Sequence, residues 1–137
     1  MIEKIKYTAD NMISTILHDI PEYDTSWQEH VKYWGNDPER TIGIDSMNFA
    51  SFVVDKTKNQ FSKDFLIRVF DLIERFLEFG NEDVEHAAMS FLQDFTNALS
   101  HYSERIPFGS YIPLLGPRSK AFCRYLDGLY GTKTPGL

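Results

Sequence analysis

The sequence has a single cysteine and no long apolar run. Cys123 alone cannot form an internal disulfide, so a disulfide-stapled fold is excluded, and this cysteine usage is typical of a reducing compartment. The N-terminal stretch MIEKIKYTADNMISTILHDI is interrupted by charges throughout. We therefore expect neither a signal peptide nor a transmembrane span, no association with a membrane, and a cytoplasmic location.

Catalytic and metal-binding motifs are also lacking. The sequence shows no nucleophile–base pattern and no phosphate-binding glycine loop. Its histidines have neither HExxH spacing nor an accompanying cysteine pair; they are His18, His30, His86 and His101. Glu82 and His86 lie four residues apart, but a metal site needs at least three convergent ligands. We expect no metal, no cofactor and no enzymatic activity, and structural roles for Cys123 and His30.

Basic residues are scarce over most of the chain. Lys and Arg number 14 against 20 Asp and Glu, which gives a net charge of −6. Residues 1–104 hold nine basic and nineteen acidic residues, whereas residues 105–137 hold five and one. Phosphate contacts require a basic surface, so we expect no nucleic-acid binding. An acidic body suits a basic protein partner, although many ordinary cytosolic proteins are equally acidic.

Apolar and aromatic side chains are abundant. Hydrophobic residues make up 42% and aromatic residues 15% of the 137 residues. This composition argues against disorder and supplies a core that needs no disulfide or metal. The length predicts one domain spanning residues 1–137.

The N-terminal third predicts two helices. Apolar residues recur at helical spacing over residues 5–20, and Pro21 ends this first helix. The second helix is predicted to begin with Asp24 or Ser26 as its N-cap and to stop at Gly35. Its two tryptophans are seven residues apart, so we expect them to pack against the core; exposed interface anchors are the alternative.

Residues 41–48 fit two local structures. Ile42 and Ile44 could belong to a short strand. Ser46 could instead cap a helix that runs through Phe49 and Val53, and their helical spacing favours this second interpretation.

The clearest elements are two amphipathic helices joined by Gly80 and Asn81. Residues 63–79 carry a broad apolar stripe and residues 82–102 a narrower one. We expect Gly80 to adopt the left-handed conformation that ends a helix, and Asn81 to cap the next. Such hairpins are the unit of helical-repeat folds, but no exact repeat is present, so a repeat-like stack and an irregular bundle both remain open.

The composition changes after residue 102. Residues 103–117 are rich in proline and glycine yet strongly apolar, which predicts an ordered loop across the body. A last helix is predicted to start at Pro117, and residues 131–137 are expected to fray. Its predicted inner face comprises Phe122, Leu126, Leu129 and Tyr130. We therefore predict an all-α domain of five to seven helices.

Three segments together carry a resemblance to a known family. They are PEYDTSWQEHVKYWGNDP, FLIRVFDLIERFLEFGNEDVEHAAMSFLQDF and LLGPRSKAFCRYLD, with His30, Trp34-Gly35, Gly80-Asn81 and Leu115-Gly116-Pro117 as the most specific positions. Over roughly residues 15–130 the chain resembles a family of small helical bacterial proteins that look like toxin-immunity proteins. The resemblance implies a compact all-helical fold and neutralisation of a toxin by binding, and it carries over no catalytic residues.

Acidic residues around the helix joint form the candidate binding site. They are Asp71, Glu74, Glu78, Glu82, Asp83 and Glu85. Only Arg75 is interleaved, so we expect their charges to be mostly uncompensated. They form either a solvated helix face or a surface complementary to a basic toxin domain. We predict an immunity-type protein that occludes its toxin through this surface; the alternative is a helical-repeat adaptor or regulatory protein, for example a phage-related one, with another protein partner.

Overall fold

The structure is a computed structural model that describes residues 4–102 and 109–137. The described residues form six α-helices and no strand, so the prediction of an all-α single domain of five to seven helices is confirmed. The helices are α1 (Ala9–Asp19), α2 (Asp24–Trp34), α3 (Ile42–Asn59), α4 (Lys63–Phe79), α5 (Glu82–Leu99) and α6 (Pro117–Tyr130). Single 3-10 turns occupy Pro21–Tyr23, Ser100–Tyr102 and Ile112–Leu114.

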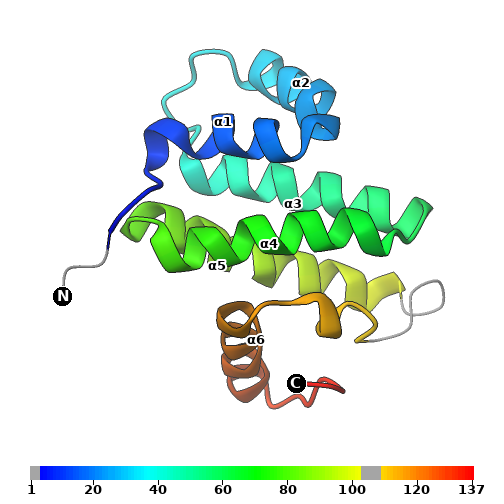
Figure 1. The fold of residues 1–137 in the computed structure, drawn as a ribbon. Helices are drawn as coiled ribbons and strands as arrows, with labels where there is room; N and C mark the ends of the chain where they lie inside the picture. Colours follow the sequence, from blue (N-terminus) through cyan, green and yellow to red (C-terminus); the bar gives the residue numbers. More distant parts are fainter. Residues whose placement is uncertain (1–3, 103–108) are drawn as a thin grey trace.

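Helices α3, α4 and α5 form the centre of the molecule. Figure 1 shows α1 and α2 on one side of this centre and α6 on the other. Helices α3 and α5 run parallel, because Ser46 of α3 contacts Ala87 and the Phe49 ring lies 5.3 Å from that of Phe91. Helix α4 therefore runs antiparallel to both helices that it connects.

Side-chain caps explain where four of the helices begin. Thr8, Thr41, Ser62 and Asn81 each precede a helix and accept a hydrogen bond from a backbone N–H of its first turn. The Thr41 cap starts α3 at residue 42, so the strand alternative for this segment is wrong.

Two predicted caps are not formed. Ser46 lies inside α3, where its hydroxyl donates to the Ala87 carbonyl at 2.6 Å and so joins α3 to α5. Helix α2 starts at Asp24 without a side-chain cap, so the prediction that Asp24 or Ser26 would cap it is wrong. The preceding 3-10 turn explains this start, because the carbonyl of Pro21 already accepts the Asp24 N–H.

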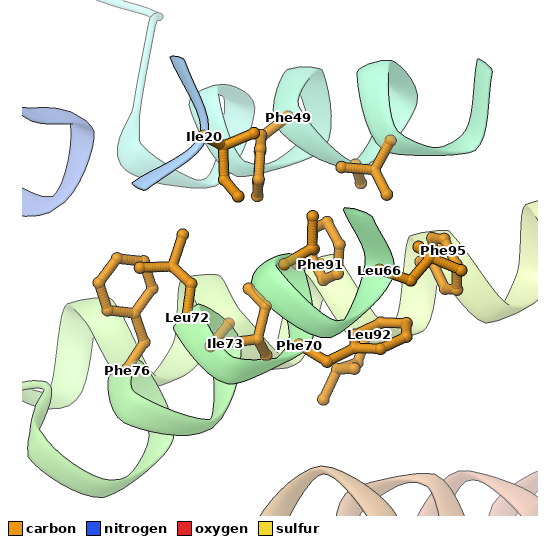
Figure 2. Packing of buried hydrophobic residues seen from close by; sticks show 14 of the residues in the cluster. Ile20, Phe49, Leu66, Phe70, Leu72, Ile73, Phe76, Phe91, Leu92 and Phe95 are labelled. Carbon is orange, nitrogen blue, oxygen red and sulfur yellow. The ribbon is translucent and has the colours of Figure 1, made fainter. Parts of the chain in front are cut away.

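Stacked phenylalanine rings fill the interior between the three central helices. Phe49, Phe70, Phe76, Phe91 and Phe95 are all buried, and Figure 2 shows them projecting into one shared core. The ring centroids of Phe91 and Phe95 are 5.8 Å apart, and Phe70 meets Phe95 edge-on at 5.4 Å. The apolar stripes predicted for α4 and α5 therefore face the core as expected.

Helix α6 starts at Pro117, as predicted, and only part of its predicted inner face is correct, because Leu126 is buried and Phe122 packs against the core. Its buried residues are Ser119, Cys123 and Leu126. Leu129 and Tyr130 are 62% and 58% exposed, so their assignment to the inner face is wrong. The small side chains of Ser119 and Cys123 join Leu126 at the contact with the rest of the protein.

The C-terminal segments lie partly within the described structure. Residues 103–108 of the predicted loop fall outside the described residues, and the remainder contains the buried side chains of Ile112 and Leu115. In the tail, which the sequence predicts to fray, the backbone N–H of Thr134 donates to Asp127 at 2.7 Å and Leu137 packs against the core.

Candidate functional site

The six predicted acidic residues divide into two groups in the structure. Asp71, Glu74 and Glu78 lie on α4, and the others lie in the first turn of α5 just beyond the joint. The α4 group is largely compensated, contrary to the expectation from sequence. Asp71 accepts a hydrogen bond from Arg75 at 3.1 Å, and Arg118 of α6 lies 3.7 Å from Glu74 and 3.6 Å from Glu78.

Glu74 acts as the N-terminal cap of α6. Its carboxylate accepts hydrogen bonds from the backbone N–H groups of Arg118 and Ser119 at 2.9 and 3.0 Å, and from the Ser119 hydroxyl at 3.1 Å. The true N-cap residue is Gly116, which has no side chain to serve this purpose. A Cβ atom at Gly116 would lie 2.5 Å from the Glu74 carboxyl carbon, so the glycine makes room for the cap.

The second group remains open to a partner. Glu82 and Asp83 are exposed and Glu85 is half-buried. Within the described ranges, no hydrogen bond or ion pair engages these three carboxylates. Their position in the first turn of α5 is favourable, because the N-terminal end of a helix carries a partial positive charge.

The joint between α4 and α5 is closed by the segment that precedes α1. The Lys6 N–H donates to the Phe79 carbonyl at 2.8 Å, and the Asn81 N–H donates to the Tyr7 carbonyl at 2.9 Å. This pairing holds Gly80 in an extended conformation, with φ −78° and ψ 150°, so the predicted left-handed conformation is wrong.

Gly80 is nevertheless required at the joint for reasons of space. A Cβ atom there would overlap the Phe76 carbonyl and lie 2.7 Å from a methyl group of Val84. Asn81, by contrast, caps α5 as predicted and accepts the Val84 N–H at 3.1 Å. The joint is therefore a fixed corner that presents the first turn of α5.

A buried ionic cluster joins α2 to the start of α3. The Nε2 atom of His30 lies 2.8 Å from an Asp45 carboxylate oxygen, and Nε of Arg40 lies 3.1 Å from the same oxygen. The Arg40 guanidinium also lies over the ring of Trp27 at 5.2 Å. His30 is thus a hydrogen-bonding residue, as its sequence context predicts. No local pattern could reveal Asp45, fifteen residues away.

Cys123 lines a small, partly open cavity between α5, α6 and the tail. The cavity has a volume of about 170 Å³, and its apolar walls include Tyr111, Leu126 and Leu137. Burial raises the pKa of the Cys123 thiol to about 11, with a further contribution from the Asp127 charge. Cys123 is accordingly a thiol at neutral pH and a poor nucleophile.

Neither a metal cluster nor a membrane span is found in the part of the chain that the structure describes. No three or more His, Cys, Asp or Glu side chains converge in residues 4–102 and 109–137. Within the same ranges, every helix is too short or too polar to cross a bilayer.

Comparison with known proteins assigns the chain to one family. No curated protein and no solved structure matches it. Residues 13–127 match a family described as a domain of unknown function, DUF7674. The match covers α2 to α5 entirely, together with most of α1 and α6. The chain therefore belongs to the DUF7674 family.

Proposed function

We propose that this chain is an immunity-type protein that binds and neutralises a cognate bacterial toxin by occlusion, without catalysis. The observation that carries the proposal is the open acidic turn at the start of α5, formed by Glu82, Asp83 and Glu85. The resemblance of the sequence to toxin-immunity proteins supports the kind of partner. The proposed place of action is the cytoplasm, where a lone reduced cysteine is common.

The chemistry of the surface favours a basic partner. Uncompensated carboxylates on a fixed corner attract a cationic surface and raise its association rate by an order of magnitude or more at low salt. Rapid capture matters for a protein that must reach a toxin before damage occurs. Lys6 lies near the joint, but its amino group lies over the Phe79 ring, 4.3 Å from the ring centroid. Among the described residues, this lysine therefore does not compensate the carboxylates of the acidic turn.

An apolar contact is available beside the acidic turn. Ile5 is 58% exposed, and it immediately precedes the residue that pairs with Phe79 at the joint. Glu78 is partly exposed next to Arg118 and adds a further carboxylate at the edge. Charge would orient the partner here, and burial of Ile5 would contribute affinity. Glu74 is omitted from the proposed surface because its oxygens cap α6.

The experiment is a growth-protection assay with a charge-reversed surface. The tagged chain is used to capture partners from its native host, and a retained basic protein is then expressed alone and together with the chain. We expect the partner to be toxic alone and harmless with the wild-type chain. The triple variant Glu82→Lys, Asp83→Lys, Glu85→Lys should fold but lose protection.

A matched variant controls for the change in net charge. Asp24→Lys, Glu39→Lys and Asp64→Lys alter, by the same amount, three exposed acidic residues at the start of α2, in the α2–α3 connection and at the start of α4. This variant should protect as well as the wild type. A partner that is harmless when expressed alone would refute the immunity function and favour an adaptor. Equal protection by both variants would refute the role of the acidic turn.

A further inference from the structure

A second surface suited to binding lies between α2 and α3, on the side of the molecule opposite α6 (Figure 1). It is a groove of about 500 Å³. Its lining includes Glu29, His30, Tyr33, Met47, Asn48 and Asp55. None of the six acidic residues around the α4–α5 joint contributes to it.

Two large side chains that line this groove are exposed to solvent. Tyr33 is 84% exposed and Met47 is 56% exposed, although methionine is among the residue types that a fold most often buries. Trp34 and Phe52 line the same groove and are half-buried. A tyrosine offers a large contact area at low entropic cost, and a methionine adapts to different partners. The two tryptophans of α2, which the sequence predicts to pack against the core, are half-buried.

The polar side chains of the groove are held in place by hydrogen bonds and ion pairs. His30 is bound to the buried carboxylate of Asp45, which in turn is bound to Arg40. The hydroxyl of Tyr23 donates to Oδ1 of Asn48 at 2.5 Å, and this hydroxyl is buried in the core. Side chains fixed in this way lose little conformational entropy when a ligand binds.

Asn48 offers hydrogen-bond donors to an occupant of the groove. Its Oδ1 atom is taken by Tyr23, and among residues 4–102 and 109–137 no group accepts from its amide nitrogen. An amide group whose oxygen is already held by Tyr23 is suited to donate its N–H to the carbonyl oxygen of a peptide backbone.

The charge of the groove favours basic residues on either side of an apolar side chain that binds in it. Glu29 and Asp55 are its charged lining residues, and no lysine or arginine is among the ten side chains that line it. Asp55 has Lys58 3.5 Å away, but that carboxylate is 61% exposed and the pair is weak in water. The lining therefore combines four large apolar or aromatic side chains with polar groups and two carboxylates.

We propose that the groove between α2 and α3 binds a segment of a partner protein in which one large apolar side chain is flanked by lysine or arginine. The apolar side chain packs against Tyr33 and Met47, its backbone carbonyl accepts from Asn48, and the basic residues face Glu29 and Asp55. This surface is separate from the acidic turn of α5, and it does not depend on the partner being a toxin.

The test uses a phage-displayed library of random peptides selected against the full chain. Enriched peptides should combine an apolar residue with neighbouring lysine or arginine, and they should bind more weakly at high salt. Tyr33→Ser and Met47→Ser should each weaken the selected peptide by about tenfold or more, as expected for a central anchor. Both side chains are exposed, so circular dichroism should show an unchanged fold. Glu29→Lys should also weaken binding.

Matched substitutions on α6 provide the control. Tyr125→Ser and Leu129→Ser change side chains that are 63% and 62% exposed, and they should leave peptide affinity unchanged. Enriched peptides without basic residues, or peptides insensitive to Tyr33→Ser, would overturn the proposal. Sedimentation equilibrium tests whether a second copy of the chain fills the groove instead. A dimer that Tyr33→Ser dissociates would show this and would also overturn the proposal. Growth protection through the acidic turn is unaffected by these outcomes, so the two proposals fail separately.

Discussion

Replacement of Glu74 by alanine should destabilise the protein far more than its place in an acidic surface cluster suggests. Its side chain is only 15% exposed, and it accepts three hydrogen bonds at the start of α6. Loss of a cap costs about 1 kcal/mol, and loss of a negative charge at a helix start costs about 0.5–1 kcal/mol. The partly buried bonds from Ser119 add about 1 kcal/mol, because they end on a charged acceptor. We therefore expect a total of about 2.5–3 kcal/mol.

Urea unfolding followed by circular dichroism measures this loss, and hydrogen exchange shows whether α6 opens first. Glu74→Gln keeps an acceptor but loses the charge, and should cost about 1 kcal/mol. Asp71→Ala is the matched control, since Asp71 is 68% exposed and only pairs with Arg75 along the same helix. That change should cost about 0.3–0.5 kcal/mol. If Glu74→Ala and Asp71→Ala had equal effects, the capping argument would be refuted.

Three further predictions concern buried groups. Phe91→Ala removes a fully buried ring and should cost about 3–5 kcal/mol in urea unfolding, whereas a loss below about 1 kcal/mol would contradict its place in the core. The Cys123 thiol should react with Ellman's reagent at pH 8 only after unfolding, and rapid reaction of the native protein would contradict its burial. Burial raises the pKa of Asp94, and its Oδ2 atom has no hydrogen-bond partner among the described residues. The charged form therefore destabilises the fold at neutral pH, so Asp94→Asn should raise stability at pH 7 and give no gain below the ordinary pKa of 3.8.

The α4–α5 hairpin could be predicted closely because its signals are local. The apolar stripe of residues 63–79 follows the helical period, and the helix occupies those residues in the structure. Asn81 caps α5 through a bond that spans three residues, which is visible in sequence as cap spacing. Such features depend on neighbours in the chain, so composition and spacing are sufficient to place them.

The errors arose where distant segments decide local structure. Gly80 is extended because Tyr7 pairs with the joint, and no sequence pattern near residue 80 predicts that strand-like contact. Glu74 appeared to be a surface carboxylate because its partners lie 44 and 45 residues further along the chain. On α6, ranking by hydrophobicity favoured Leu129 as an inward residue, whereas close packing selected Ser119 and Cys123.

The parallel arrangement of α3 and α5 has a consequence for folding kinetics. The bond between Ser46 and Ala87 spans 41 residues, so these two helices cannot meet until the chain between them has reversed direction twice. The two helices of the α4–α5 hairpin, by contrast, are adjacent in sequence and are connected by only Gly80 and Asn81. Contacts of long sequence separation slow folding, so we expect the hairpin to form early and the α3–α5 interface to limit the rate. Ser46→Ala should then slow refolding of the whole chain. Asn81→Ala removes the cap of α5, so it should reduce the helicity of the isolated hairpin.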